Sequence, residues 1–407
     1  MSAGVRVRAI LPAVGIWADV PALRPVLVLA LIDAAAAAAF SGSITVLLLR
    51  TTSMRLEEVG LGLSISGAVT ILSTVPLGRL IDRIGPKAYL VCASLVSAAA
   101  YATVPLVNSV LSLALALGVA GGAFSAGWPA LQSVIGSIAS DNRTTVLGTL
   151  RSVRNIGYAL AGVIIGLAIW MPARPGVFLV AGLATFSYLV SAAVYGRVTM
   201  PARAPRDAPT EGRRPRISAS YVGLMLASTV FAFGTIILDI GFPLWLTRSE
   251  SVPTYLAGAA LIVNTLLVII AQPHAANLSN TIRRARLGLV LSASCFVASY
   301  AVMFGIDSFG LLAFLGVVVA TVLFTAGEIL ESAAWWTVSY ELAPAAVRNE
   351  HLSFFSLNYQ IVAAVGPLAV AAALSQGAIG WLYFAAASAL AGICAFALLA
   401  GRQDGTS

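Results

Sequence analysis

Long apolar segments alternate with short polar ones along the whole chain. A helix that crosses a bilayer needs about 20 apolar residues. Backbone N–H and C=O groups find no water inside hydrocarbon, so we expect each long apolar segment to be an α-helix. The pattern therefore predicts an all-α integral membrane protein with twelve transmembrane helices. The expected spans are 25–49, 59–80, 88–107, 110–138, 146–170, 176–196, 219–246, 254–276, 286–305, 309–336, 353–375 and 378–400.

The basic residues predict how these helices are oriented. Arg50, Arg55, Arg174 and Arg248 fall on one side, and the other 20 of the 24 Lys and Arg residues fall on the opposite side. Loops rich in Lys and Arg stay in the cytoplasm, so we expect both termini to be cytoplasmic. An apolar run in residues 1–23 is broken by prolines, which favours an uncleaved lead-in on the membrane surface over a signal peptide.

The longest polar stretch, 197–218, is rich in Pro and Arg and is expected to be an extended linker. A weak internal echo supports a duplication, because Gly162 follows Ser152, and Gly366 follows Ser356, at the same spacing. The expected parts are a cytoplasmic lead-in at 1–24, a six-helix bundle at 25–196, the linker at 197–218, a second six-helix bundle at 219–400 and a cytoplasmic tail at 401–407.

Composition supports lipid as the solvent. Hydrophobic residues make up 59% of the 407 residues and charged residues 10%, whereas soluble domains carry about 25% charge. The net charge of +8 is spread between apolar runs, so it indicates membrane topology and no nucleic-acid partner. No phosphate-binding loop, zinc-protease motif or serine-hydrolase motif occurs, and the His and Cys residues form no ligand set. We expect no enzyme activity, no bound cofactor and no metal site.

A dense charged turn joins the second and third spans. Residues 78–87 hold two glycines, one acid and three bases, and glycine permits the sharp turn that such a short connection needs. The spacing resembles the loop between helices 2 and 3 of the major facilitator superfamily of transporters, although a proline stands where a base is usual. The matching residues, called the signature loop below, are Gly78, Asp82, Arg83, Gly85 and Lys87.

The resemblance implies two pseudo-symmetric six-helix bundles that expose a central site to each side in turn. The equivalent loop of the second half, 273–284, keeps two bases but no acid, a decay that is common in this superfamily. We expect a monomer in lipid that moves a small-molecule substrate. The composition also suggests a GC-rich bacterial genome and hence a bacterial cytoplasmic membrane.

Four acids inside the expected spans are the candidates for proton coupling or substrate binding: Asp33, Asp239, Glu328 and Glu331. A charge at mid-bilayer costs about 2.5–3.5 kcal/mol, so such residues face a cavity, find partners or stay protonated. Asp33 and Glu328 lie at a similar depth, about 12 Å from the cytoplasmic ends of their helices. Asp33 is either functional or a structural acid bonded to a neighbouring helix.

Glu328 and Glu331 share one helix face and resist simultaneous ionisation, so one of them is a plausible proton carrier. The alternative for Glu331 is pairing with Arg348 or another base near the cytoplasmic rim. Asp239 lies near the outer rim, where it either lines a gate or is a solvated interfacial acid.

A glutamate in helix 10 resembles the proton-linked drug antiporters of the superfamily. Two departures weaken this resemblance. The fifth span has Ala161 and Gly162 where a Gly-Pro pair is usual, and no arginine occurs within 113–127 of the fourth span. Arg151 and Arg154 are expected to anchor the inner surface, able to pair with Asp82 in one state of a transport cycle.

Aromatic residues supply candidate cavity walls for apolar or cationic substrates. The candidates are Phe40, Trp128, Phe231 and Tyr359. Trp335 and Trp336 are favoured as residues of the interfacial belt.

These features favour proton-coupled export of small amphipathic drugs or metabolites, with protons as the partner ion and the proton gradient as the energy source. The alternative in the same class is proton-coupled uptake of a nutrient or metabolite. The alternative in another class is a membrane sensor or scaffold that does not transport.

Overall fold

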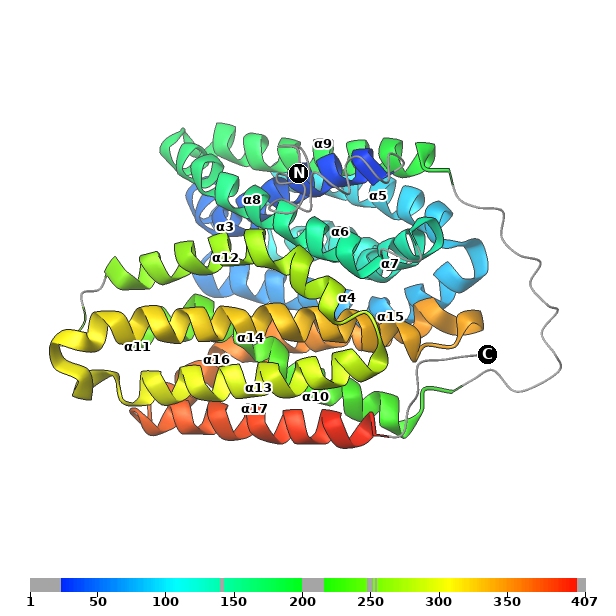
Figure 1. Cartoon of the computed structure of the whole chain (residues 1–407). Coiled ribbons are helices and arrows are strands. Elements are labelled where there is room, and N and C mark those ends of the chain that lie inside the picture. Colours follow the sequence, from blue (N-terminus) through cyan, green and yellow to red (C-terminus); the bar gives the residue numbers. More distant parts are fainter. Residues whose placement is uncertain (1–22, 140–142, 200–215, 247–251, 253–254, 401–407) are drawn as a thin grey trace, which may run out of the picture. The chain divides into compact units, whose positions relative to one another are not determined.

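Helices make up the regular secondary structure of the described part of the chain. The computed structural model describes residues 23–139, 143–199, 216–246, 252 and 255–400. Within these residues, twelve helices are long and apolar enough to cross a membrane, as the hydropathy pattern predicts (Figure 1). Nearly all of the expected lead-in, most of the expected linker and the expected tail lie outside the described residues.

The chain divides into two units, of which the first comprises Met1–Pro215 and Pro344–Phe354. The expected boundary placed this second segment in the other bundle. The six spans of the first unit are built from α3 (Arg24–Thr51), α4 (Leu56–Ile84), α5 (Pro86–Ala102), α6 (Val110–Phe124) with α7 (Gly127–Ile138), α8 (Arg143–Trp170) and α9 (Ala173–Arg197). The short helix α15 (Arg348–Phe355) lies almost entirely in this unit.

The second unit comprises Arg216–Ala343 and Phe355–Ser407. Its first span begins as α10 (Ala219–Ile236), passes through a π-helical turn at Ile237–Gly241 and ends as α11 (Phe242–Leu246). The other long helices of this unit are α12 (Tyr255–Leu278), α13 (Ile282–Phe304), α14 (Ala313–Glu341), α16 (Leu357–Leu374) and α17 (Ile379–Leu398).

The two units repeat the same pattern of helix packing. In the first unit, α3 packs on α8 and α9, α4 packs on α6, and α5 packs on α6 and α9. In the second unit, α10 packs on α16 and α17, α12 packs on α14, and α13 packs on α14 and α17. Helices in corresponding positions therefore choose corresponding partners, which agrees with the six-plus-six repeat expected from the sequence.

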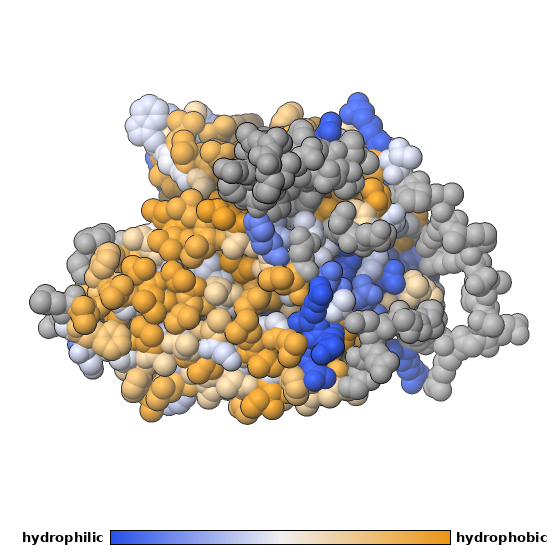
Figure 2. Space-filling model, in the orientation of Figure 1, coloured by the Kyte–Doolittle hydropathy of each residue, from blue (hydrophilic) through white to orange (hydrophobic). Residues whose placement is uncertain are grey.

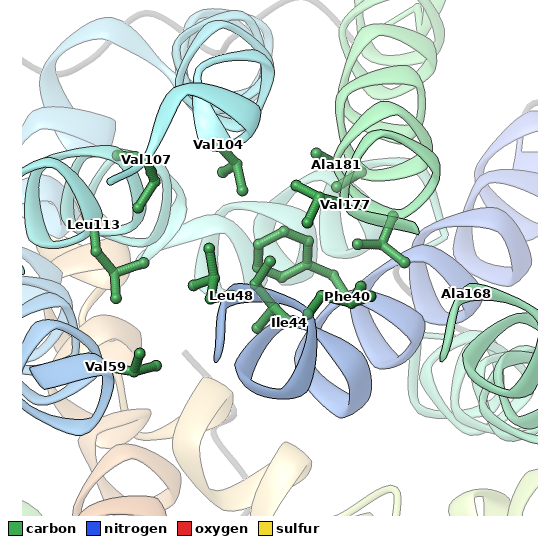
Figure 3. Packing of buried hydrophobic residues seen from close by; sticks show 14 of the residues in the cluster. Phe40, Ile44, Leu48, Val59, Val104, Val107, Leu113, Ala168, Val177 and Ala181 are labelled. Atoms are coloured by element: carbon green, nitrogen blue, oxygen red, sulfur yellow. The ribbon is translucent and has the colours of Figure 1, made fainter. Parts of the chain in front are cut away.

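A hydrophobic cluster fills the first unit at one end of α3. Phe40, Ile44 and Leu48 recur every four residues and so share one face of this helix. They lie with Val177 and Ala181 of α9 in a cluster that extends to α4, α6 and the turn after α5 (Figure 3). This packing fixes α3 against α9 and so holds the rest of α3 in register with the other helices.

Large apolar side chains also cover the outside of the helices. Leu72, Val163 and Leu368 are each more than 70% exposed. Figure 2 shows hydrophobic residues over much of the visible surface. Such a surface is stable in lipid, so this chain is a multi-pass membrane protein.

The turn between α4 and α5 depends on Gly85. Its φ of 90° and ψ of 150° place it in a region that only glycine adopts readily, and Pro86 begins α5 immediately afterwards. The two helices thus meet with a single residue between them.

Replacing Gly85 by Ala is expected to lower the melting temperature, because the new side chain would strain this backbone by about 1–3 kcal/mol. The matched control is Gly182→Ala in α9, where a Cβ meets nothing within 4 Å. That change should leave stability equal or slightly higher, since Ala favours a helix by about 1 kcal/mol over Gly. Thermal unfolding in detergent measures both, and equal melting temperatures for the two variants would contradict the role given to Gly85.

Candidate functional site

Asp82 of the signature loop caps the beginning of α15 within the first unit. Its Oδ1 accepts hydrogen bonds from the backbone N of Asn349, at 3.1 Å, and from Nδ2 of Asn349, at 2.8 Å. Its Oδ2 accepts from the backbone N of Glu350, at 3.0 Å. The first N–H groups of a helix have no partner inside the helix, so a carboxylate there satisfies them and favours the positive end of the helix dipole.

Residues near Asp82 also bind side chains at the beginning of α15. Arg79 Nε lies 2.7 Å from Glu350 Oε1, and Ser133 of α7 donates to Asn349 Oδ1 at 2.6 Å. A Cβ at Gly78 would lie 2.7 Å from the backbone oxygen of Asn349, so glycine is required for the close approach. Among the other signature residues, Arg83 is exposed and Lys87 is half-buried.

Asp33 forms an ion pair with Arg154 inside the first unit. Arg154 Nη1 lies 2.6 Å from Asp33 Oδ2, and Arg154 Nη2 donates to the hydroxyl of Tyr158 at 3.0 Å. The side chains of Asp33 and Arg154 are 22% and 29% exposed. Arg154 was expected to anchor the inner surface and to be able to pair with Asp82; in the structure its guanidinium pairs with Asp33 of α3 instead.

Small residues bring these two helices together. A Cβ at Gly157 of α8 would lie 2.6 Å from the backbone oxygen of Leu31 and 2.8 Å from Cβ of Ala34. The glycine and the alanine run of α3 therefore let the backbones approach closely, one turn from the ion pair. This approach puts Asp33 within reach of Arg154.

A small pocket opens beside the Asp33–Arg154 pair. Apart from the ion pair, its walls are apolar or aromatic and come from α3, α7, α8 and α9 of the first unit. They are formed by Val26, Leu29, Ala30, Trp128, Leu131, Leu150 and Tyr195.

Glu328 lies in a second polar cluster, inside the second unit. Asn264 Nδ2 donates to Glu328 Oε2 at 2.7 Å and to Thr325 Oγ1 at 3.0 Å. The Thr325 hydroxyl itself donates to the backbone oxygen of Thr321, so its oxygen can only accept from the amide. Because the Thr325 oxygen accepts, the side chain of Asn264 presents its NH₂ group, and not its oxygen, to both Thr325 and the carboxyl of Glu328.

The other two candidate acids differ in their surroundings. Glu331 is 3% exposed, on the buried side of α14. Asp239 is exposed and lies in the π-helical turn. π-Helical turns occur frequently at functional sites, and this one separates α10 from α11.

The candidate aromatic residues are divided between pocket and core. Trp128 lines the pocket beside Asp33. Phe40 and Phe231 depart from the expected cavity lining, because they are 5% and 2% exposed and pack in apolar cores. Tyr359 is 43% exposed.

The expected belt position of Trp335 and Trp336 is also wrong, since these side chains are 4% and 7% exposed. Trp335 packs against Phe231 and Phe355 inside the second unit, with ring centroids 5.8 Å and 5.7 Å apart.

Several partners of the candidate residues escaped the sequence analysis. Asn264 is a lone amide in an apolar run, which is a signal in itself, because a polar side chain in a span needs a partner. Tyr158 stands one helical turn after Arg154, a spacing that places both on one face. Asn349, by contrast, carries no sequence signal for its contact with Asp82.

Comparison with known proteins gives a family and a fold. The family model described as Major Facilitator Superfamily matches residues 26–367. The chain is similar to the crystal structure of a bacterial homologue of the iron transporter ferroportin in an outward-facing state, with 16% identity, a TM-score of 0.69, and coverage of 93% of this chain and 98% of that one.

The form of that homologue with soaked iron gives 18% identity, a TM-score of 0.68, and coverage of 92% and 97%. At this identity the likeness concerns the fold alone. No curated protein matches the chain.

Replacing Asp82 by Asn is expected to loosen the beginning of α15. Hydrogen bonds to a charged group contribute about 1.5–3 kcal/mol, so amide hydrogen exchange at Asn349 and Glu350 should become about tenfold faster or more. Mass spectrometry of peptides covering Pro344–Phe354 measures this. Arg83→Gln changes the charge of the same loop at an exposed side chain and should leave the exchange unaltered. Unchanged protection in the Asp82 variant would contradict the capping role.

Proposed function

Because this chain belongs to the Major Facilitator Superfamily, and so is a transporter and not an enzyme, we propose that it moves a small amphipathic drug or metabolite by alternating access coupled to protons. The proposed direction is export, with substrate leaving as protons enter. The proton gradient is the energy source, and no cofactor is needed. The proposed location is a bacterial cytoplasmic membrane, with a monomer whose termini are both cytoplasmic.

The observation that carries proton coupling is the environment of Glu328. This acid is 8% exposed in a transmembrane helix, and its carboxyl accepts from the amide of Asn264 at 2.7 Å. An ionised carboxyl inside a transmembrane helix is costly, and a bound proton removes its charge. Glu328 is thus suited to gain and lose a proton during a transport cycle. Asp33, Glu331 and Asp239 are the other proposed coupling residues.

Proton-coupled uptake is the second candidate function, and the Asp33–Arg154 pair favours it. Neutralising Asp33 would free the guanidinium of Arg154 to bind a substrate, so proton and substrate would travel together. Experiment can distinguish the two directions of transport. Export moves the proton and the substrate in opposite directions, whereas uptake moves both in the same direction.

Iron is not proposed as the substrate. The likeness to the ferroportin homologue rests on 16–18% identity and concerns the fold. In addition, the residues that the structure describes contain no group of three or more His, Cys, Asp or Glu side chains that could hold a metal ion. No observation on this chain therefore favours iron over an amphipathic organic molecule.

Replacing Glu328 by Gln tests the proposal. Glutamine keeps the size of the side chain but cannot take up a proton, so proton-driven transport in everted vesicles should fall to the level seen without a proton gradient. Exchange of labelled for unlabelled substrate without a gradient should continue, because it needs alternating access but no net proton movement.

The matched control is Glu341→Gln, the same change at an exposed position of α14. It should leave both activities at the wild-type level. Proton-driven transport at the wild-type rate in the Glu328 variant would exclude Glu328 as the proton carrier.

A further inference from the structure

We propose that the beginning of α13 and the end of α17, both in the second unit, form a docking surface for an anionic phospholipid. Arg283, Arg284 and Arg286, called the basic patch below, would hold the phosphate of its headgroup. The apolar side chains beyond them would contact its acyl chains. This inference goes beyond the proposed function, because it concerns the surrounding membrane and neither the substrate nor the proton.

The basic patch concentrates three permanent positive charges within four consecutive residues. A guanidinium keeps its proton at every pH that a cell tolerates. Arg283 and Arg284 are exposed, and Arg286 is half-buried. The first turn of α13 holds no acid, so these bases also repel the positive end of the helix dipole. A negatively charged partner would relieve both repulsions.

Two of the three guanidiniums have neutral partners. Arg284 Nη1 donates to Asn280 Oδ1 at 3.1 Å. The guanidinium of Arg286 lies 4.0 Å from the ring centroid of Phe396 in α17, within the range of a cation–π contact. These contacts orient the guanidiniums and leave their positive charge in place.

The helices packed on α13 do not neutralise the basic patch. They are α12, α14 and α17, of which α12 and α17 contain no acid. The end of α14 lies beside the beginning of α13, because Thr337 donates to the backbone oxygen of Ser279 at 2.6 Å. Glu341 is the acid at this end of α14. Even with Glu341 ionised, the three bases retain a surplus of two positive charges.

The helices α13 and α17 form one continuous surface at this end. They lie side by side in Figure 1. A Cβ at Gly392 of α17 would lie 2.7 Å from Cβ of Ala293, so glycine allows the two helices to approach closely. The contact between Arg286 and Phe396 extends the joined surface to the basic patch.

Exposed apolar side chains continue this surface along both helices. Leu287, Val290 and Leu291 of α13 are exposed and follow the bases at helical spacings of three and four residues, so they share a face with them. Ile393 and Phe396 of α17 are exposed as well. Figure 2 shows a hydrophilic patch that borders the hydrophobic surface near the beginning of α13. The surface is therefore cationic at one end and apolar along its length, which matches a phospholipid.

This arrangement selects a membrane lipid with a net negative charge. A guanidinium donates paired hydrogen bonds to phosphate oxygens. A zwitterionic headgroup carries its own cation, which the basic patch repels, whereas an anionic headgroup is attracted as a whole. A soluble anion would bind the bases but leave the apolar surface uncovered. The occupant that uses both parts is an anionic phospholipid.

The experiment compares two lipids with the same acyl chains, dioleoylphosphatidylglycerol and dioleoylphosphatidylcholine. Native mass spectrometry measures their binding to the purified, full-length protein after removal of its lipids in mild detergent. Phosphatidylglycerol is expected to bind at least about tenfold more tightly than phosphatidylcholine. Glycerophosphoglycerol, the same headgroup without acyl chains, should bind at least about tenfold more weakly than the lipid.

Replacing all three residues of the basic patch by Gln should abolish this preference, because the headgroup charge then meets neutral side chains. Replacing them by Lys keeps the charge and should retain most of the preference. The matched control removes the same charge at exposed positions elsewhere and should bind phosphatidylglycerol as the wild type does. It combines Arg174→Gln, Arg197→Gln and Arg216→Gln.

A second measurement needs no substitution. Phosphatidylglycerol with a photoreactive diazirine on its headgroup is added to phosphatidylcholine vesicles that contain the wild-type protein. After illumination, mass spectrometry of peptides should find the crosslinks concentrated in residues 282–291 and 390–398.

Four results would overturn the inference: equal affinity for the two lipids, wild-type preference in the Gln variant, loss of preference in the control variant, or crosslinks concentrated elsewhere. Binding of glycerophosphoglycerol as tightly as the lipid would show a site for a soluble anion instead. None of these results bears on proton coupling at Glu328, because lipid binding is measured without transport.

Discussion

Hydrocarbon supplies no hydrogen-bonding partner, and every other feature of this chain follows from that constraint. Backbone groups satisfy one another within helices, so the regular secondary structure of the described residues is helical. Side chains face the same condition, so a polar residue within a span is stable only beside another. The clusters around Asp33 and Glu328 are two examples: in the first an arginine donates to the acid, and in the second an asparagine donates to the acid and to a threonine hydroxyl.

Small residues decide where such partners can meet. Gly157 lets α8 approach α3 beside the ion pair of Asp33, and Gly78 lets α4 approach the chain at Asn349 beside Asp82. Near Glu328, a Cβ at Gly327 would lie 3.1 Å from a backbone oxygen of α13. In all three places a glycine stands within four residues of a functional candidate. The close approach of two helix backbones at a glycine therefore brings the polar side chains nearby within hydrogen-bonding distance.

The sequence was sufficient for the helices and for the repeat, because both depend on long apolar runs and on the distribution of bases. The need for glycine in the signature loop could also be predicted, because Gly85 adopts a positive φ and Gly78 makes a close backbone contact. The pairing of Arg154 with Asp33 could not be predicted from the sequence. It depends on how far α3 and α8 are rotated about their axes, and mean hydropathy carries no information on rotation. For the same reason, the core positions of Phe40 and Phe231 and the burial of Trp335 differed from expectation.

Under the proposed proton coupling, the two polar clusters would respond to a proton in opposite ways. Protonation of Glu328 removes a negative charge beside a neutral amide, whereas protonation of Asp33 exposes a positive charge that was cancelled before. Moving one charge across a membrane is worth about 2.3 kcal/mol per 100 mV, so this difference has consequences for the driving force. A proton and an anion held together at Asp33 and Arg154 add no net charge to the pair. Their joint movement would respond to the pH gradient and not to the membrane potential. A proton carried by Glu328 alone would respond to the gradient and, where its movement crosses the field, to the potential as well. The two acids, one in each six-helix bundle, would then draw on different parts of the same proton-motive force.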